Sequence, residues 1–202
     1  MDFPNARNAT PVIPAKPNLR RVTAVVFDHQ KPRDAVHLLA AMSDLCDFGD
    51  LKYLNHFDGY PQFLYWENYE FFKFIRTDFA LFLHLDGYIL RPDLWEPEFL
   101  KYDYIGAPWP KELNPDRVGN GGFCIKSRRL MSRVAQLPWV NVPGDVMVCT
   151  TYRKKLIAEG FTFAPPHVAA RFSVEMQCPE SVPDTFGFHG TVTGRPIFTP
   201  QF

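Results

Sequence analysis

The sequence ALFLHLDG, residues 80–87, is the stretch that decides the fold. Its apolar residues are bounded by a glycine, which is typical of a short buried strand. Asp86 at the end of that strand is costly to bury unless another group compensates its charge. Ligands of open α/β sheets bind beyond the carboxyl ends of strands, so this position suits a metal or a phosphate group. The alternative is a turn residue, since Asp86 and Gly87 form a common turn pair.

Strands and helices alternate on both sides of this stretch. β-branched apolar runs predict strands, and apolar residues at helical spacing predict helices. The expected strands cover residues 22–27, 51–54, 80–87, 102–106 and 123–126, and the expected helices cover residues 32–45, 66–75, 128–137 and 145–158. Prolines divide residues 161–202 into short irregular segments. The alternation predicts an α/β fold with a mixed, mostly parallel central sheet flanked by helices.

Length and composition limit the classes of function. The 202 residues suit one domain over 21–202, preceded by a proline-containing extended arm over 1–20. The formal net charge is zero, so no whole-protein field favours nucleic acid. The four cysteines are widely scattered, which disfavours a Cys-x-x-Cys zinc site. Neither a signal peptide nor a bilayer-spanning run is recognisable, so we expect a cytoplasmic protein, with peripheral attachment at the inner membrane surface as an alternative.

Two polar features follow the central strand in the chain. Gly119, Asn120, Gly121 and Gly122 precede a strand rather than a helix, which disfavours the dinucleotide-binding and P-loop fingerprints. These glycines either let the backbone approach a ligand, with the Asn120 side chain supplying hydrogen bonds, or form a tight turn. Asp145 begins an expected helix. There it is either an N-cap or a general base for an acceptor hydroxyl.

Three further side chains suit binding or catalysis. Glu175 either pairs with Arg171 or binds a sugar hydroxyl, and the ion pair is the simpler interpretation. His189 lies between aromatic residues and glycines, where an imidazole can be structural, ligate a metal or contact phosphate. His84 is two residues before Asp86, so in a strand both would point to one face and approach one metal or phosphate. Asp28 ends its own strand in the same way.

Basic residues form three groups in the sequence. Such groups are usually solvated surfaces, and the alternatives are a diphosphate, an anionic lipid surface or a DNA backbone. The groups are Lys16, Arg20 and Arg21; Lys126, Arg128, Arg129 and Arg133; and Arg153, Lys154 and Lys155.

Six segments, in the same order, resemble a bacterial and phage family of uncharacterised glycosyltransferase-like proteins. They are residues 84–87, 102–109, 118–123, 144–146, 170–175 and 186–190. That family resembles the GT-A class of nucleotide-sugar glycosyltransferases, which implies a GT-A-like sheet with a Rossmann-like nucleotide-binding half. In that class an Asp-x-Asp motif holds a divalent metal that grips the donor diphosphate. Here His84 stands at the first position of that motif and Asp86 at the second.

The resemblance implies a role for each candidate residue. His84, Asp86 and His189 would hold a divalent ion; Mg²⁺ needs only oxygen ligands, whereas a histidine suits Mn²⁺ better. Asp145 would be the catalytic base, although Gly144 replaces the acidic residue that often precedes it. The remaining candidates would bind donor or acceptor, with Trp109 stacking on a sugar face. They are Asp28, Gly87, Trp109, Asn120, Gly121, Gly122 and Glu175.

The resemblance also implies the partners. We expect a nucleotide-sugar donor, a UDP-sugar by preference, and as acceptor a saccharide of a surface polymer. One alternative acceptor is a hydroxymethylated base in DNA, which would need a basic cleft and a flipped base. The other alternative is a protein that binds a nucleotide or glycan without turnover, which the incomplete Asp-x-Asp motif favours.

Overall fold

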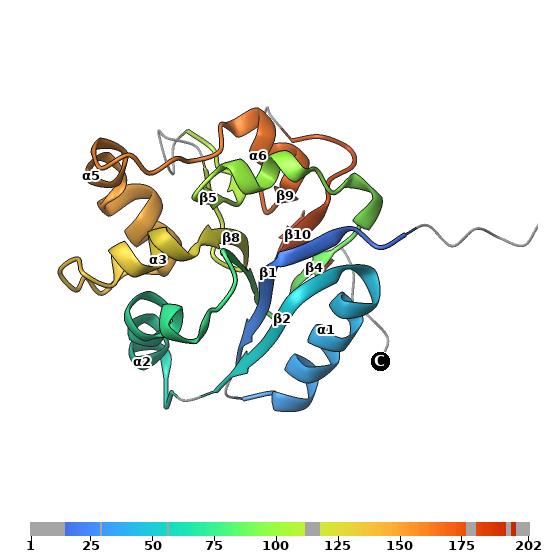
Figure 1. Cartoon of the computed structure of the whole chain (residues 1–202), viewed down its shortest axis with the longest axis horizontal. Helices are drawn as coiled ribbons and strands as arrows, with labels where there is room; N and C mark the ends of the chain where they lie inside the picture. The colour runs from blue at the N-terminus through green and yellow to red at the C-terminus, as the bar shows by residue number, and fades with distance from the viewer. Residues whose placement is uncertain are drawn as a thin grey trace, which may run out of the picture.

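The computed structural model describes residues 15–28, 30–55, 57–111, 118–176, 181–192 and 195–196. Most of the expected N-terminal arm, residues 1–14, lies outside this range. The first strand begins earlier than the apolar run predicts, at Asn18 instead of residue 22. Figure 1 shows this strand, β1, crossing the middle of the molecule.

The central sheet has five strands in the order β2-β1-β3-β8-β5. These strands are β1 (Asn18–Phe27), β2 (Asp47–Leu54), β3 (Phe79–Leu83), β5 (Tyr104–Ile105) and β8 (Phe123–Ser127). β1 runs parallel to β2 and β3, whereas β8 is antiparallel to both β3 and β5. Two of the four strand pairs are parallel and two are antiparallel, and among these five strands β8 alone runs against the others, which agrees with the expected mixed α/β sheet. Helical crossovers link β1 to β2 and β2 to β3, whereas the described residues between β5 and β8 contain no helix, and an antiparallel pair needs none.

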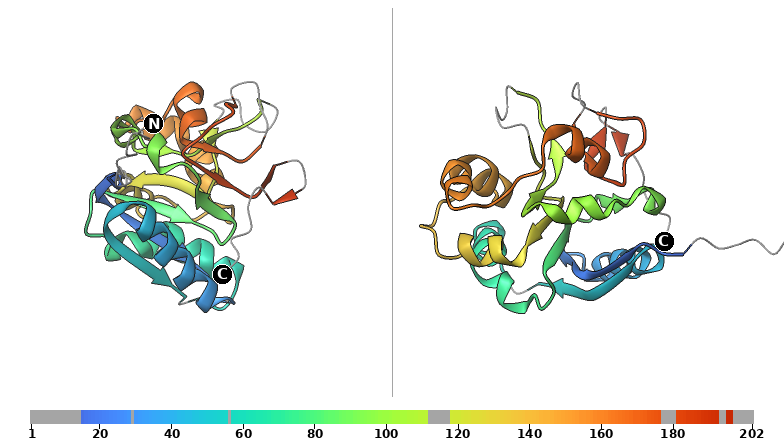
Figure 2. Two further views of the ribbon diagram at one scale, coloured as in Figure 1. Left: turned by 90° about the vertical axis from the view of Figure 1, so that its right-hand side faces the viewer. Right: turned by 45° about the horizontal axis from the view of Figure 1, so that its top comes forward.

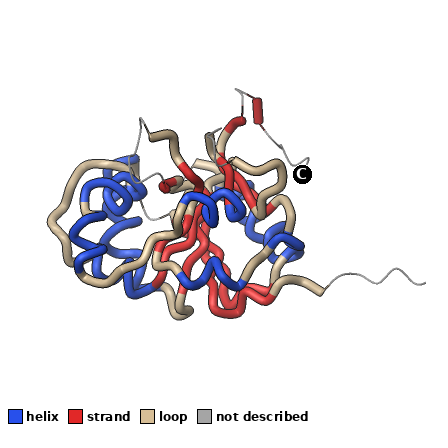
Figure 3. Tube along the Cα trace, turned by 90° about the horizontal axis from the view of Figure 1, so that it is seen from above, coloured by secondary structure: helices blue, strands red, loops and turns tan. Residues whose placement is uncertain are grey.

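Helices flank this sheet (Figures 2 and 3). The predicted helix at 32–45 is confirmed as α1 (Pro32–Leu45), which packs on β1 and β2. The predicted helix at 66–75 begins earlier, since α2 (Tyr60–Tyr65), η1 (Trp66–Glu70) and η2 (Phe71–Phe74) follow one another directly. The other helical segments are η3 (Pro92–Leu94), η4 (Pro97–Lys101), α3 (Arg128–Val134), α4 (Gly144–Val146), η5 (Met147–Thr151), α5 (Arg153–Ala158) and α6 (Pro166–Phe172).

Apolar packing fills the sheet from both faces. Every residue of β3 and β8 is buried, which explains why β3 is an uninterrupted apolar run. The rings of Phe27 and Phe82 pack against Phe71 of η2 on one face. Buried residues of α1 cover β1, and the Met42 sulfur accepts a hydrogen bond from the backbone N–H of Ile89. The sheet is thus a rigid support for the loops at its edge.

A second sheet, of three strands, places a C-terminal strand next to β4, which directly follows the end of β3. Its order is β4-β10-β9, with β10 antiparallel to β4 and parallel to β9. These strands are β4 (Gly87–Ile89), β9 (Ser173–Val174) and β10 (Gly187–His189). Short pairs also join β6 (Ala107–Pro108) to β7 (Val118–Gly119) and β11 (Thr191–Val192) to β12 (Arg195–Pro196). Residues 161–202 therefore contain α6 and paired strands instead of only irregular segments.

Two predicted boundaries next to the candidate site need correction. β3 ends at Leu83, and the N–H of Gly87 donates to the carbonyl of His84 at 3.0 Å. Asp86 thus lies in a turn instead of ending the strand, because that turn starts the antiparallel return into β4. The helix expected from Asp145 is divided into α4, η5 and α5, and Gly160 with φ +85° follows its end.

Candidate active site

Two histidines and an aspartate meet where β3 ends. One nitrogen or oxygen atom from each of His84, Asp86 and His189 lies within 4.8 Å of the other two. Nε2 of His189 is 3.2 Å from Oδ1 of Asp86, and the two imidazole rings meet edge-on with centroids 5.1 Å apart. His84 and Asp86 come from the β3–β4 turn, and His189 ends β10 opposite Gly87. The structure thus brings together the three residues that the sequence assigns to a metal.

The backbone at this point requires glycine. A Cβ on Gly122 would collide with the imidazole of His189, and a Cβ on Gly87 would lie 2.5 Å from the carbonyl oxygen of Gly122. The same carbonyl accepts a hydrogen bond from the N–H of His84 at 2.9 Å. The segment containing Gly122 and the turn containing Asp86 therefore approach closely only because neither glycine carries a side chain.

Glu175 contacts His189 on the side of the imidazole away from Asp86, and Trp109 contacts Glu175. Nδ1 of His189 lies 3.1 Å from Oε1 of Glu175, and the indole N–H of Trp109 donates to Oε2 of Glu175 at 2.5 Å. The expected pairing of Glu175 with Arg171 is wrong, since Arg171 pairs with Glu96 and Glu98 in its place. Trp109 is only 8% exposed, and its ring fills the space beside Gly119. This leaves little of the indole face for the predicted sugar stacking.

The charges of the cluster are coupled. Burial lowers the pKa of His189, but hydrogen bonds with Asp86 and Glu175 outweigh burial and raise it to about 9. The hydrogen bond with His189 in turn lowers the pKa of Asp86. Burial and the neighbouring His189 lower the pKa of His84, so its imidazole is neutral and retains a lone pair. Once His189 gives up its Nε2 proton, the two imidazoles and one carboxylate form a mixed nitrogen and oxygen donor set, which suits Mn²⁺ better than Mg²⁺.

Asn120 shapes the glycine-rich turn. It has φ +77°, a left-handed conformation that asparagine tolerates better than most residues. Its Oδ1 accepts hydrogen bonds from the N–H groups of Gly122 and Phe123, each at 3.1 Å, and Nδ2 donates to Ser173. Asn120 is fully buried. Its amide therefore organises the protein backbone, and Gly121 is the member of the turn that faces Asp145.

Asp145 lies opposite this turn and is not an N-cap. Its Oδ2 accepts from the N–H of Gly121 at 2.8 Å, and its Oδ1 accepts from the N–H of Val146 at 2.8 Å. Pro143 is the capping residue of α4, without a side-chain hydrogen bond. Burial raises the pKa of Asp145, and the charges of Glu67 and Glu175 raise it further. A carboxylate with a raised pKa in this position suits a general base.

A buried ion pair lies next to Asp145, and the sequence did not identify it as part of the site. Nζ of Lys126 lies 2.7 Å from Oε1 of Glu67, and the two side chains are 3% and 5% exposed. Lys126 also lies over the ring of Phe82, 4.2 Å from its centroid. One feature of the sequence could have indicated the pair. Lys126 stands in a strand whose other residues are apolar or small, and a buried charge there needs a partner.

A cavity of about 440 Å³ adjoins the cluster of His84, Asp86 and His189. Asp28 reaches it from the end of β1, and Oδ1 of Asp28 accepts from the N–H groups of Gln30 and Lys31. Aromatic rings and polar groups alternate around the cavity, which is lined by Phe27, Asp28, Gln30, Phe57, Gly59, Tyr60, Phe63, His84, Leu85 and Asp86. The cavity has the aromatic walls and few polar groups of a small-molecule site.

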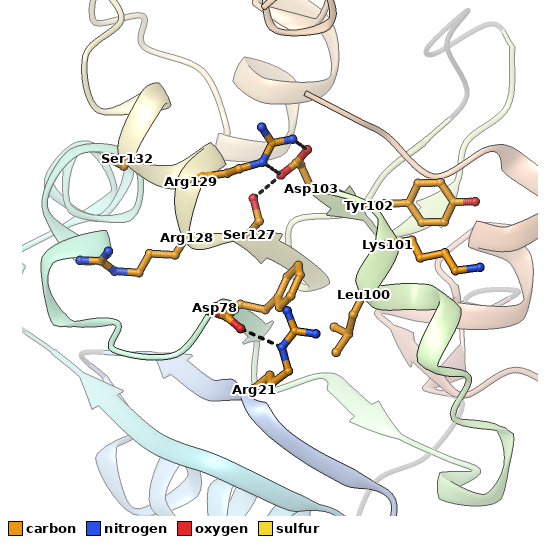
Figure 4. A pocket seen from close by; sticks show the side chains of 11 residues that line it. Arg21, Asp78, Leu100, Lys101, Tyr102, Asp103, Ser127, Arg128, Arg129 and Ser132 are labelled. Carbon is orange, nitrogen blue, oxygen red and sulfur yellow. Dashed lines mark hydrogen bonds and ion pairs between the residues drawn. The ribbon is translucent and has the colours of Figure 1, made fainter. Parts of the chain in front are cut away.

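Another cavity, of about 620 Å³, lies at the opposite end of β3 (Figure 4). Its inward charges neutralise one another, because Arg21 pairs with Asp78, and Arg129 and Ser127 both bind Asp103. The paired charges and the absence of a metal-type cluster among its lining residues argue against this cavity as the reaction site.

The basic groups of the sequence are mostly engaged in ion pairs. Lys126 is buried with Glu67, Arg20 pairs with Asp47, and Arg133 and Lys155 both pair with Glu159. Cations neutralised in this way do not favour a DNA surface. In the part of the chain that the structure describes, no helix combines the length and the apolar character needed to cross a membrane.

Comparisons with known proteins agree with the fold. Residues 46–189 match the model of a family described as "Protein of unknown function (DUF5672)". No curated protein matches the sequence. One similar solved structure is a glycosyltransferase involved in the glycosylation of the major capsid of PBCV-1, at 15% identity and TM-score 0.50, covering 83% of this chain and 91% of that one. Another is the mannosyltransferase PcManGT from Pyrobaculum calidifontis in complex with GDP-Man and Mn²⁺, at 12% identity and TM-score 0.46, covering 75% and 55%. At such identities the first likeness shows a shared fold.

Proposed function

The chain belongs to the family described as "Protein of unknown function (DUF5672)", and we propose that it is a glycosyltransferase that moves a sugar from a nucleotide-sugar donor to an acceptor hydroxyl. One observation carries the proposal: the cluster of His84, Asp86 and His189 adjoins the aromatic cavity. The fold shared with a glycosyltransferase is consistent with it. GT-A membership and a UDP-sugar donor remain predictions.

The cluster fits a divalent ion. His84 is neutral, Asp86 is ionised, and Nδ1 of His189 is held by Glu175, so that Nε2 can be a ligand when a metal displaces its proton. A carboxylate on the far nitrogen of a metal-binding histidine orients the ring and strengthens it as a ligand. When bound there, a divalent ion would supply positive charge to the donor diphosphate as it leaves.

The donor nucleotide would occupy the aromatic cavity. Tyr60 is 58% exposed and its ring offers a face on which a base can stack, supported by the ring of Phe63 behind it. Asp28 would accept hydrogen bonds from the ribose or base. The diphosphate would then lie toward His84 and Asp86, at the boundary between the cavity and the cluster.

Asp145 would act on the acceptor. It accepts the proton as the hydroxyl O–H bond breaks; the hydroxyl oxygen bonds to the anomeric carbon, and the bond from that carbon to the phosphate oxygen breaks. The nucleoside diphosphate leaves with the electron pair of that bond. The N–H of Gly121 holds Asp145 in place, and the default acceptor is a saccharide of a surface polymer.

A thermal-shift screen of nucleotide-sugars, each with and without Mn²⁺, tests the proposal. A ligand at about 100 times its dissociation constant adds about 2.7 kcal/mol to the free energy of unfolding. We expect at least one nucleotide-sugar to stabilise the protein in the presence of Mn²⁺, and Asp86→Ala to abolish the gain. Asp93→Ala is the matched control, since Asp93 is an exposed partner of Arg91. Stabilisation by no nucleotide-sugar under either condition would contradict the proposal.

A further inference from the structure

The buried pair of Glu67 and Lys126 is not explained by folding alone. Removing two charges from water is costly, and well-packed apolar residues often replace a buried ion pair without loss of stability. The pair borders the candidate site, since η1 brings Glu67 against Gly144 of α4 and both charges act on His84 and Asp145. A role in the site is therefore a reason for both charges to be there.

Gly144 shows how closely Glu67 approaches the backbone next to Asp145. A Cβ on Gly144 would collide with Oε1 of Glu67 and lie 2.6 Å from its Oε2. Gly144 is helical and has no positive φ, so its backbone does not require glycine. What requires glycine is the carboxylate of Glu67, which fills the space of a side chain immediately before Asp145.

The surroundings of Asp145 divide into two sides. The backbone N–H groups of Gly121 and Val146 bind its oxygens and favour the ionised carboxylate. The negative charges of Glu67 and Glu175 oppose this, and after burial that of Glu67 is the strongest cause of the raised pKa of Asp145. Lys126 offsets part of the effect, but its ammonium group is bound to Glu67.

We propose that Glu67 is a positioning residue for Asp145. Its carboxylate packs against Gly144, and its negative charge favours proton uptake by Asp145, while the ammonium group of Lys126 compensates that charge in a buried place. This inference rests on the proposed function, in which Asp145 takes the proton of the acceptor hydroxyl.

The direct test is an NMR titration of the Asp145 carboxyl carbon in the whole protein, assigned with Asp145→Asn. We expect the midpoint to fall by about one pH unit in Glu67→Gln, because a neighbouring like charge is lost. Glu70→Gln is the matched control in the same helical segment, where Glu70 pairs with Lys73 and should leave the midpoint unchanged. An unchanged midpoint in Glu67→Gln overturns the inference. Should that variant not fold, Glu67→Gln/Lys126→Gln removes both charges, and a smaller fall is expected; no fall overturns the inference.

A second measurement tests the packing. Gly144→Ala should lower the melting temperature of the wild-type protein, but much less in a Glu67→Ala background, where the clash is absent. Equal losses in both backgrounds would contradict the contact. Neither the titration nor this cycle needs turnover. If the wild-type protein shows no turnover, the proposed function is contradicted. The NMR midpoint still tests the effect of Glu67 on Asp145 in that case.

Discussion

Nδ1 of His189 lies 3.1 Å from Oε1 of Glu175, so the imidazole that faces Asp86 is held from behind by a carboxylate. Such outer contacts commonly account for a 10- to 100-fold share of metal affinity. We therefore expect Glu175→Gln to weaken Mn²⁺ binding by about 10-fold or more in isothermal titration calorimetry.

Trp109→Phe separates the contact from the packing, because it removes the N–H that reaches Glu175 but retains an aromatic ring. Its loss in Mn²⁺ affinity should be smaller than that of Glu175→Gln. Unchanged affinity in both variants would show that His189 needs no support from this side.

Gly122→Ala should disrupt the metal cluster while leaving the sheet intact. Its new methyl group would occupy the position of the His189 ring, and that ring cannot move toward Asp86 without losing Glu175. We expect Mn²⁺ to stop stabilising the variant in a thermal-shift assay.

Gly190→Ala is the matched control. Gly190 has φ +80°, and a Cβ added there would meet no atom within 4 Å, so the substitution adds backbone strain of about 1–2 kcal/mol without a clash. Its Mn²⁺ response should persist. Loss of the response in Gly190→Ala alone would contradict this account of the cluster.

Asp103→Asn should change stability in acid. Burial raises the pKa of Asp103, but hydrogen bonds from Arg129, Ser127 and the N–H of Thr162 outweigh burial and lower it. A lowered carboxyl pKa gives stability that is present above about pH 4 and is lost as pH falls through the folded-state pKa. The variant should lose about 2 kcal/mol at pH 7 and progressively less below pH 4, as measured by urea unfolding. An equal loss at every pH would exclude ionisation of Asp103 as the cause.

The sequence predicts the parts of the site whose residues are close together in the chain. It does not predict the parts that depend on contacts between distant segments. His84 and Asp86 are neighbours after an apolar strand, so their proximity is local. His189 joins them only through the pairing of β10 with β4, which the ordered motifs implied but no local pattern required.

The sequence does not predict which charged residues pair with one another. Arg171 is four residues from Glu175, yet α6 directs it to Glu96 while Glu175 turns toward His189. Lys126 belongs to a basic run whose other members reach the surface, and its burial with Glu67 follows from its place in β8. The reversed direction of β8 in the central sheet likewise follows from connections that composition does not specify.

The most direct test of the central claim is turnover of nucleotide-sugars by the purified chain with Mn²⁺, measured as release of nucleoside diphosphate. We expect turnover by the wild-type protein. Asp145→Asn should lower the rate by about 100-fold or more, since a general base contributes at least that much, and Asp86→Ala should lose Mn²⁺-dependent turnover. Near wild-type rates in both variants would contradict the proposed glycosyltransferase site.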